Sequence, residues 1–210
     1  SVLDREICCG ETIRRMGNET LFQQTARSNI ARWNQLGVKK IITGCPHCYN
    51  TLKNEYPDFG GEYEVIHYTS LVAKLLKEGK LAIPGMLNKV VTYHDPCYLG
   101  KHNGIYDEPR IILSAIPGIK LTEMPRNKES AFCCGGGGGR YWIHSSFPNP
   151  IKAHRVSEAL STQGQVIATA CSFCKMVMTE EIEKNHPASA VEVMELSELL
   201  AEDGLISRSL

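Results

Sequence analysis

The sequence predicts an α/β fold made of two repeat units, each with a small parallel sheet flanked by helices. Short β-rich runs alternate with helical patterns, similar blocks recur about 125 positions apart, and cysteines follow the predicted strands. Ligands of parallel sheets bind beyond the carboxyl ends of the strands. The cysteines are therefore expected at the carboxyl edge of each sheet.

Strands are predicted where short apolar runs end close to a cysteine. These runs are KKIITG at 39–44, KVVTYHDP at 89–96 and QVIATA at 165–170. A helix is expected before the first of them, because its periodic pattern stops at Gly37, and glycine is typical of a helix end. The alternation of strand and helix favours parallel pairing.

A further helix is predicted in the stretch TSLVAKLLKEGK, 69–80. Its apolar residues at positions 71, 72, 75 and 76 share one face, as the helical period requires. The Ser or Thr that opens the stretch is expected to cap this helix, and Gly79 to end it. Another helix is expected to begin at CSFC, where its N-terminus would favour the thiolate form of Cys171 and Cys174.

The chain uses one unit twice. A CCG motif begins at Cys8 and again at Cys133, which is 125 positions later. A C-x-x-C motif begins at Cys45 and again at Cys171, which is 126 positions later. A similar apolar block follows each C-x-x-C motif, so three separated blocks agree in order and spacing.

The second unit has one cysteine more than the first. Cys97 lies 36 positions before Cys133, and its counterpart in the first unit would lie about 28 positions before residue 1. The first unit, 1–86, is therefore expected to be cut short at its N-terminus. The second, 87–210, is expected to be complete, with IPGMLN as the linker between the two.

Composition excludes several function classes. The 210 residues carry 23 Lys and Arg against 23 Asp and Glu, so nothing suggests a nucleic-acid or polybasic membrane partner. No apolar run reaches the roughly 18 residues of a membrane span. Nine cysteines, an odd number, fit a closed disulfide framework poorly, which leaves metal or cluster ligation as the favoured role.

Zinc and an iron–sulfur cluster compete for these cysteines. Zinc takes four ligands, whereas the second unit offers five thiols: Cys97, Cys133, Cys134, Cys171 and Cys174. The adjacent pair in this set can reach two different irons. The residues therefore favour an iron–sulfur cluster, with a zinc-stabilised interaction module as the alternative.

A run of five glycines follows the second CCG motif. Glycine lets the backbone approach a bulky cluster and direct N–H groups toward its sulfides, so Gly135, Gly136 and Gly137 are predicted to contact the cofactor. Arg140 follows the run and could offset the charge of a thiolate-ligated cluster, and an ordinary surface arginine is the alternative.

Two histidines lie close to cysteines in the sequence. His94 ends a predicted strand three residues before Cys97, so it could tune the cluster or relay protons. A hydrogen-bonded structural histidine is the alternative. His47 lies between the cysteines of CPHC and is expected to point away from both, so it is expected next to the metal ligands without being one of them.

The arrangement C-x35-C-C-G…C-x-x-C resembles the CCG cysteine-rich domain of heterodisulfide reductases and their relatives. The stretches HDPCYLGKHNGIYDEPR, FCCGGGGGR and TGCPHCYNTLKNEYP are similar to the C-terminal part of heterodisulfide-reductase-like iron–sulfur oxidoreductases. This resemblance implies two Rossmann-like units. It also implies a non-cubane [4Fe–4S] cluster held by the five cysteines of the second unit.

The first unit matches the motif without its leading cysteine. Its four cysteines are Cys8, Cys9, Cys45 and Cys48. The resemblance leaves open whether they hold a second cluster, a zinc ion or nothing.

The resemblance also implies a function. The expected role is electron transfer from a flavoprotein or ferredoxin-type donor to a quinone, with reduction of a disulfide or heterodisulfide as the alternative enzyme activity. The expected partners are such a redox protein and an upstream segment or a further protein chain. The expected location is the cytoplasm, with any membrane association through segments that this chain does not contain.

Overall fold

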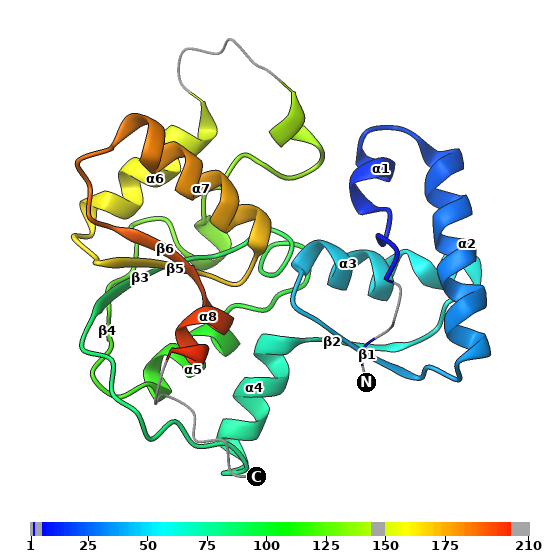
Figure 1. Cartoon of the computed structure of the whole chain (residues 1–210), viewed down its shortest axis with the longest axis horizontal. Coiled ribbons are helices and arrows are strands. Elements are labelled where there is room, and N and C mark those ends of the chain that lie inside the picture. The colour runs from blue at the N-terminus through cyan, green and yellow to red at the C-terminus, as the bar shows by residue number, and fades with distance from the viewer. Residues whose placement is uncertain (1, 3–5, 144–149, 203–210) are drawn as a thin grey trace.

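The structure is a computed structural model of the chain (Figure 1), and it describes residues 2, 6–143 and 150–202. The first part of the chain contains α1 (Glu11–Arg15), α2 (Glu19–Gln35), β1 (Lys40–Thr43), α3 (Pro46–Asn54), the 3-10 helix η1 (Tyr56–Phe59), β2 (Glu64–His67) and α4 (Tyr68–Lys77). The second part contains β3 (Val90–His94), α5 (Asp107–Ala115), β4 (Lys120–Leu121), η2 (Lys128–Ser130), η3 (Arg140–Trp142), α6 (Ile151–Ser161), β5 (Val166–Thr169), α7 (Ser172–Asn185), β6 (Glu192–Glu195) and α8 (Leu196–Ala201).

The strands form two parallel sheets. β1 pairs with β2, and the second sheet has the order β4-β3-β5-β6, with every neighbouring pair parallel. The predicted α/β class is confirmed. The three predicted strands are present as β1, β3 and β5, each one or two residues shorter at one or both ends than its apolar run.

Helices cover both faces of the four-stranded sheet (Figure 1). On one face, α6 and α7 pack Val156, Val177 and Met178 against Ile167 of β5. On the other face, α5 and α8 pack Leu113 and Leu199 against β3 and β5, whose strands are buried along nearly their whole length. Burial on both faces explains why these strands read as continuous apolar runs.

The smaller sheet has its own core beneath α2. Phe22, Ala26, Ile30 and Trp33 recur at helical spacing along one face of α2 and pack with Tyr56. The Trp33 ring stacks on Tyr56 at 5.7 Å between centroids. This core supports the first cysteine pair, since Cys9 is one of its buried members.

Helix α4 leads from the first sheet into the core of the second. Its Ala73 packs with Ile112 of α5, with Ile116 directly after that helix, and with Leu200 of α8. The predicted boundary between the units near residue 86 stays a prediction. Helix α4 precedes this boundary in the chain but packs against helices that follow it. Within the described ranges, none of the helices combines the length and apolarity that a membrane crossing requires.

The predicted cap of α4 is wrong. The N-cap is His67, whose Nδ1 accepts a hydrogen bond from the Thr69 backbone N–H at 3.4 Å. The reason is that β2 runs straight into α4 without a loop, so the last strand residue occupies the capping position. Burial lowers the pKa of His67 to about 4, which keeps its ring neutral and able to accept.

Candidate metal centre

The parallel strands bring cysteines to the carboxyl edges of the two sheets, as predicted. Cys45 lies two residues beyond β1, Cys171 two residues beyond β5, and Cys97 three residues beyond β3. Helices α3 and α7 begin directly after Cys45 and Cys171, which are their N-cap residues. Each C-x-x-C motif therefore wraps the first turn of a helix, where backbone N–H groups favour thiolate sulfur.

The CC pairs lie in loops, and buried polar groups hold both loops. In the first unit, Asn29 Nδ2 donates to the Cys8 carbonyl at 3.1 Å, and the Tyr56 hydroxyl donates to the Cys9 carbonyl at 3.0 Å. In the second unit, Asp95 at the end of β3 accepts from the Lys128 backbone N–H at 2.9 Å, shortly before the CC pair. These bonds place each pair beside the helix start that carries the C-x-x-C motif.

Both CCG motifs make the same turn. Gly10 and Gly135 have φ values of 85° and 86°, in the left-handed region that other residues rarely adopt. Their backbone N–H groups point at the sulfurs of Cys8 and Cys133, at 3.4 and 3.2 Å. The repeat in the sequence is therefore also present in the structure, where each CCG glycine directs its backbone N–H group at a cysteine sulfur.

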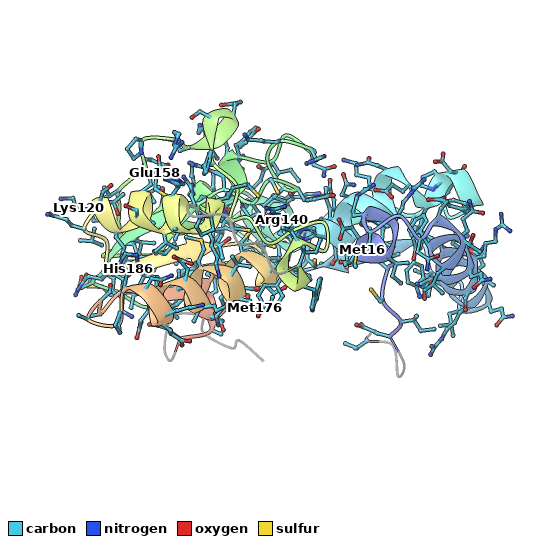
Figure 2. The ribbon with its side chains drawn as sticks, turned by 90° about the horizontal axis from the view of Figure 1, so that it is seen from above. Met16, Lys120, Arg140, Glu158, Met176 and His186 are labelled. Atoms are coloured by element: carbon cyan, nitrogen blue, oxygen red, sulfur yellow. The ribbon has the colours of Figure 1, made fainter. Side chains whose placement is uncertain are left out.

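Other glycines of the run lie where neighbouring side chains leave no space for a Cβ atom. A Cβ on Gly136 would lie 2.3 Å from Cγ2 of Val177 in α7, and one on Gly139 would lie 2.5 Å from Met16 of the first unit. Figure 2 shows Met16 and Arg140 where the two units meet. Arg140 is exposed and, with Gly135 and Gly136, lines a cavity of about 630 Å³ beside α7.

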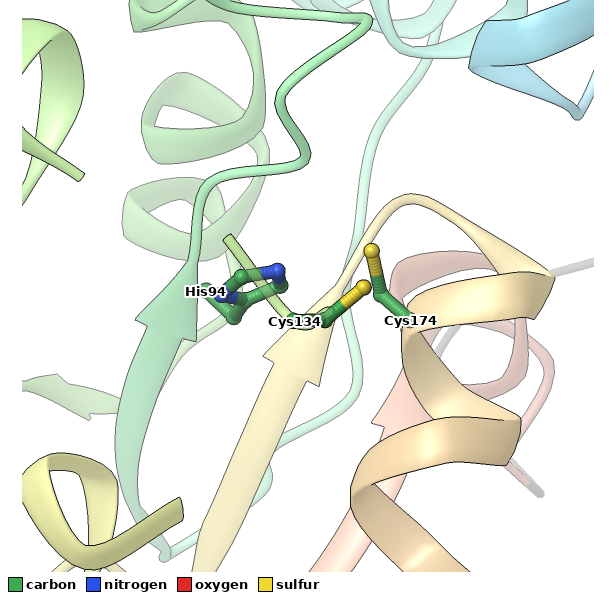
Figure 3. Close-up of side chains that lie close together, drawn as sticks. All are labelled: His94, Cys134 and Cys174. Atoms are coloured by element: carbon green, nitrogen blue, oxygen red, sulfur yellow. The ribbon is translucent and has the colours of Figure 1, made fainter. Parts of the chain in front are cut away.

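His94 faces the sulfurs of the second unit. Its imidazole and the sulfurs of Cys134 and Cys174 form a buried group whose ligand atoms lie within 4.8 Å of one another (Figure 3). His94 Nδ1 accepts a hydrogen bond from Arg155 Nε at 2.9 Å. The neutral ring must therefore carry its hydrogen on Nε2.

His94 is neutral, and its Nε2 has no protein partner among the described residues. Burial and the neighbouring Arg155 guanidinium lower the pKa of His94 to about 3. Nε2 is fully buried without a hydrogen-bond partner in that part of the chain. A buried N–H group is rarely left without an acceptor, so the position of this atom supports a bound group beside it. That His94 lies beside a metal site stays a prediction.

The five thiols of the second unit adjoin one another. Electrostatic interactions between neighbouring thiols connect them in the order Cys97, Cys133, Cys134, Cys174 and Cys171. The neighbouring thiols of Cys134 and Cys97 lower the pKa of Cys133 to about 2, and the Cys133 thiol in turn raises the pKa of Cys97. Thiolate charge is therefore favoured at Cys133 and Cys171, whereas the pKa values of Cys97, Cys134 and Cys174 are raised.

The first unit has a second group of thiols, linked in the order Cys8, Cys9, Cys48 and Cys45. His47 joins the two groups, because its Nδ1 lies 3.8 Å from Sγ of Cys45 and 3.8 Å from Sγ of Cys171. Burial opposes the imidazolium, but the sulfurs of Cys171 and Cys45 outweigh it and raise the pKa of His47 to about 10.

The expectation that His47 points away from both flanking cysteines is wrong for Cys45. Cys45 is the N-cap of α3 and His47 is the second helical residue, so its side chain turns back over the cap.

Sequence reasoning missed three side chains that shape this site. Arg155 is fully buried on α6, on the same inward face as Val156 and Ala159. An arginine at helical spacing among apolar residues was the sequence signal that could have predicted its burial. Tyr98 and Phe173 are adjacent to cysteines and contact the His47 ring at centroid distances of 4.5 and 5.2 Å. These two contacts join residues of different units, so they could be found only from the way the units pack together.

Comparison with known proteins gives the site a context. The sequence profile of the CCG cysteine-rich domain matches residues 1–53 and 91–179. The chain is 44% identical over 202 residues to the probable iron–sulfur-binding oxidoreductase FadF of Bacillus subtilis, covering 96% of this chain and 29% of that protein. It is 42% identical to the EtfAB:quinone oxidoreductase of Syntrophomonas wolfei, covering 93% of this chain and 28% of that protein.

A third relative comes from Methanosarcina barkeri. It is one of the subunits of the dihydromethanophenazine:CoB–CoM heterodisulfide reductase, and it is 36% identical, covering 95% of this chain and 50% of that protein. The chain therefore spans half or less of the length of these curated relatives.

Proposed function

The chain belongs to the CCG cysteine-rich domain family, and we propose that its second unit holds a [4Fe–4S] cluster of the non-cubane type as part of an oxidoreductase. The five adjoining thiols of that unit would be the ligands: Cys97, Cys133, Cys134, Cys171 and Cys174. When bound, such a cluster supplies electron transfer, while the chain positions it and sets its potential.

The buried Nε2–H of His94 carries this proposal. Arg155 fixes the ring tautomer, so the N–H is directed toward Cys134 and Cys174 although no protein acceptor is present among the described residues. A thiolate or sulfide of a bound cluster would accept this hydrogen bond. Gly135 would supply a further amide to the same sulfur-rich site through its contact with Cys133.

A single zinc ion explains the site less well. Four tetrahedral Zn–S bonds of about 2.3 Å hold the sulfurs close around one point. Within the described part of the chain, the group gathered inside 4.8 Å contains only two of the five second-unit sulfurs, together with His94. The wider spread of the remaining sulfurs favours a bulkier inorganic group.

Electrons are proposed to come from a flavoprotein or ferredoxin-type donor and to reach a quinone. The names of the two relatives at 44% and 42% identity, an iron–sulfur-binding oxidoreductase and an EtfAB:quinone oxidoreductase, support this direction. The relative at 36% identity supports disulfide reduction as the second candidate. A redox protein and a further segment or protein chain are the proposed partners, since the relatives are about twice as long as the matched region or longer.

The four thiols of the first unit offer one ligand fewer. We infer that this unit needs a further ligand to hold the same group, and that otherwise it holds a zinc ion or remains metal-free. Its CCG turn and sulfur-directed Gly10 amide repeat those of the second unit, which supports a related role.

Replacing Cys97 with serine is expected to abolish cluster binding in the second unit. Cys97 adjoins Cys133 at one end of the five-thiol group, so its loss removes a ligand that zinc does not need. Iron and acid-labile sulfide would be measured after anaerobic reconstitution. The control is Cys8→Ser, an exposed cysteine of the first unit, which should leave the second-unit iron unchanged. Full iron retention in Cys97→Ser would argue against the five-cysteine site.

A further inference from the structure

The nine sulfurs of the chain form two groups that meet at one imidazole. Cys45 ends the first group and Cys171 ends the second, and His47 Nδ1 lies 3.8 Å from both sulfurs. His47 belongs to the first unit by sequence, and only 5% of its surface is exposed. A residue of one unit therefore reaches a predicted cluster ligand of the other.

The second unit holds the His47 ring on three sides. Tyr98, which follows Cys97, packs on it with centroids 4.5 Å apart, and Phe173, between the cysteines of CSFC, meets its edge at 5.2 Å. On the third side the glycine run passes so close that a Cβ on Gly137 would lie 3.2 Å from His47 Nε2. The ring is thus fixed by all three segments that carry the cysteines of the second unit.

The first unit fixes Tyr98 in turn. Arg15 of α1 donates to the Tyr98 hydroxyl at 2.9 Å, and the same guanidinium pairs with the buried Glu55. Each unit therefore contributes a side chain that the other unit contacts: His47 of the first unit packs in the second, and Tyr98 of the second unit is hydrogen-bonded by the first. This mutual arrangement leaves the imidazole little freedom to turn away from the sulfurs.

We propose that His47 is a positioning residue that donates its Nδ1–H to the sulfurs of Cys171 and Cys45, and thereby sets the reduction potential of the second-unit cluster from the first unit. This inference rests on the proposed cluster. A metal-bound thiolate can only accept a hydrogen bond, so the ring nitrogen that faces it must be the donor.

The physical effect follows from the charge of the ligand. Hydrogen bonds to ligand sulfurs stabilise the more negative, reduced state of an iron–sulfur centre and raise its potential. Removing the His47 donor is therefore expected to lower the potential. A charge-assisted hydrogen bond is strong enough for about a tenfold change in the reduced-to-oxidised ratio, which for one electron corresponds to about 59 mV.

Three variants separate the donor from the ring. His47→Phe keeps an aromatic ring between Tyr98 and Phe173 but removes the N–H. His47→Asn loses the ring but keeps an N–H at the position of Nδ1. The control is His102→Phe, because His102 is exposed and stacks on Tyr98 at 4.4 Å between centroids.

The measurement is an EPR-monitored redox titration of the reconstituted protein, with iron and sulfide determined for each variant. We expect a lower midpoint potential in His47→Phe, with wild-type iron content, and a potential close to wild type in His47→Asn and His102→Phe. A His47→Phe potential equal to that of the wild type would overturn the inference and leave the proposed cluster intact.

A gentler variant covers the case in which His47→Phe does not retain iron. Gly137→Ala keeps His47 but presses a methyl group against Nε2, and its backbone lies outside the left-handed region. We expect a smaller fall in potential, and no fall in this variant would overturn the inference. Wild-type protein without iron would overturn the proposed function as well, so the two failures are distinguishable.

Discussion

Replacing Arg155 with leucine is expected to destabilise the metal-free protein by roughly 3 kcal/mol, as typically follows when one partner of a buried charged network is removed. Arg155 is fully buried and donates to His94 Nδ1 at 2.9 Å, to the Arg126 carbonyl at 2.8 Å and to Glu158 at 3.0 Å. Leucine leaves His94 Nδ1 and the Arg126 carbonyl without this donor, whereas Glu158 keeps its hydrogen bonds from Arg126. Chemical denaturation of the reduced, metal-free chain measures the loss.

The same variant should also lower the reduction potential of the reconstituted protein, because nothing would then hold the His94 hydrogen on Nε2. The matched control is Arg126→Leu. Arg126 pairs with the same Glu158, but its side chain is 46% exposed, so the expected loss is about 1 kcal/mol or less. Equal destabilisation in the two variants would contradict the role of Arg155 in ordering His94.

The second large effect is expected for Gly136→Ala. The added Cβ would lie 2.3 Å from Cγ2 of Val177, a buried residue of the helix that carries Cys174. Overpacking of this kind typically destabilises by about 1–3 kcal/mol. It should also push the CCG loop away from α7, so the iron content should fall. At Gly44, where a Cβ would meet nothing within 4 Å, alanine should change neither quantity.

A compensating change tests the contact itself. In the double variant Gly136→Ala with Val177→Ala, the clashing methyl is absent, and the destabilisation should be smaller than the sum of the two single changes. Iron content should recover with it. Additive losses would show that Gly136 is required for some reason other than its distance from Val177.

The architecture of each unit could be predicted because it depends on local patterns. Short β-rich runs located β1, β3 and β5, and the repeated spacing placed the cysteines after the strands. The cap of α4 could not be predicted in this way, because no sequence signal shows that β2 continues into the helix without a loop. His67 therefore took the place expected for Ser or Thr.

The contacts between the units lay beyond the sequence. The repeated sequence pattern describes each unit, but it does not show how the two units pack together. The contact between His47 and Cys171 and the hydrogen bond from Arg15 to Tyr98 could therefore not be predicted. Arg155 illustrates a second limit, because a charged residue on a helix is expected to face solvent. Its burial follows from the His94 acceptor at the end of β3, 61 positions away.

The central claim is that five cysteines of the second unit hold an iron–sulfur cluster. Its most direct test is to purify the chain without oxygen and to measure iron, acid-labile sulfide and zinc per chain, with EPR after mild oxidation and reduction. The account predicts about four irons with matching sulfide for the second unit, and an EPR signal that responds to redox state. A colourless protein that contains zinc and no iron would contradict it.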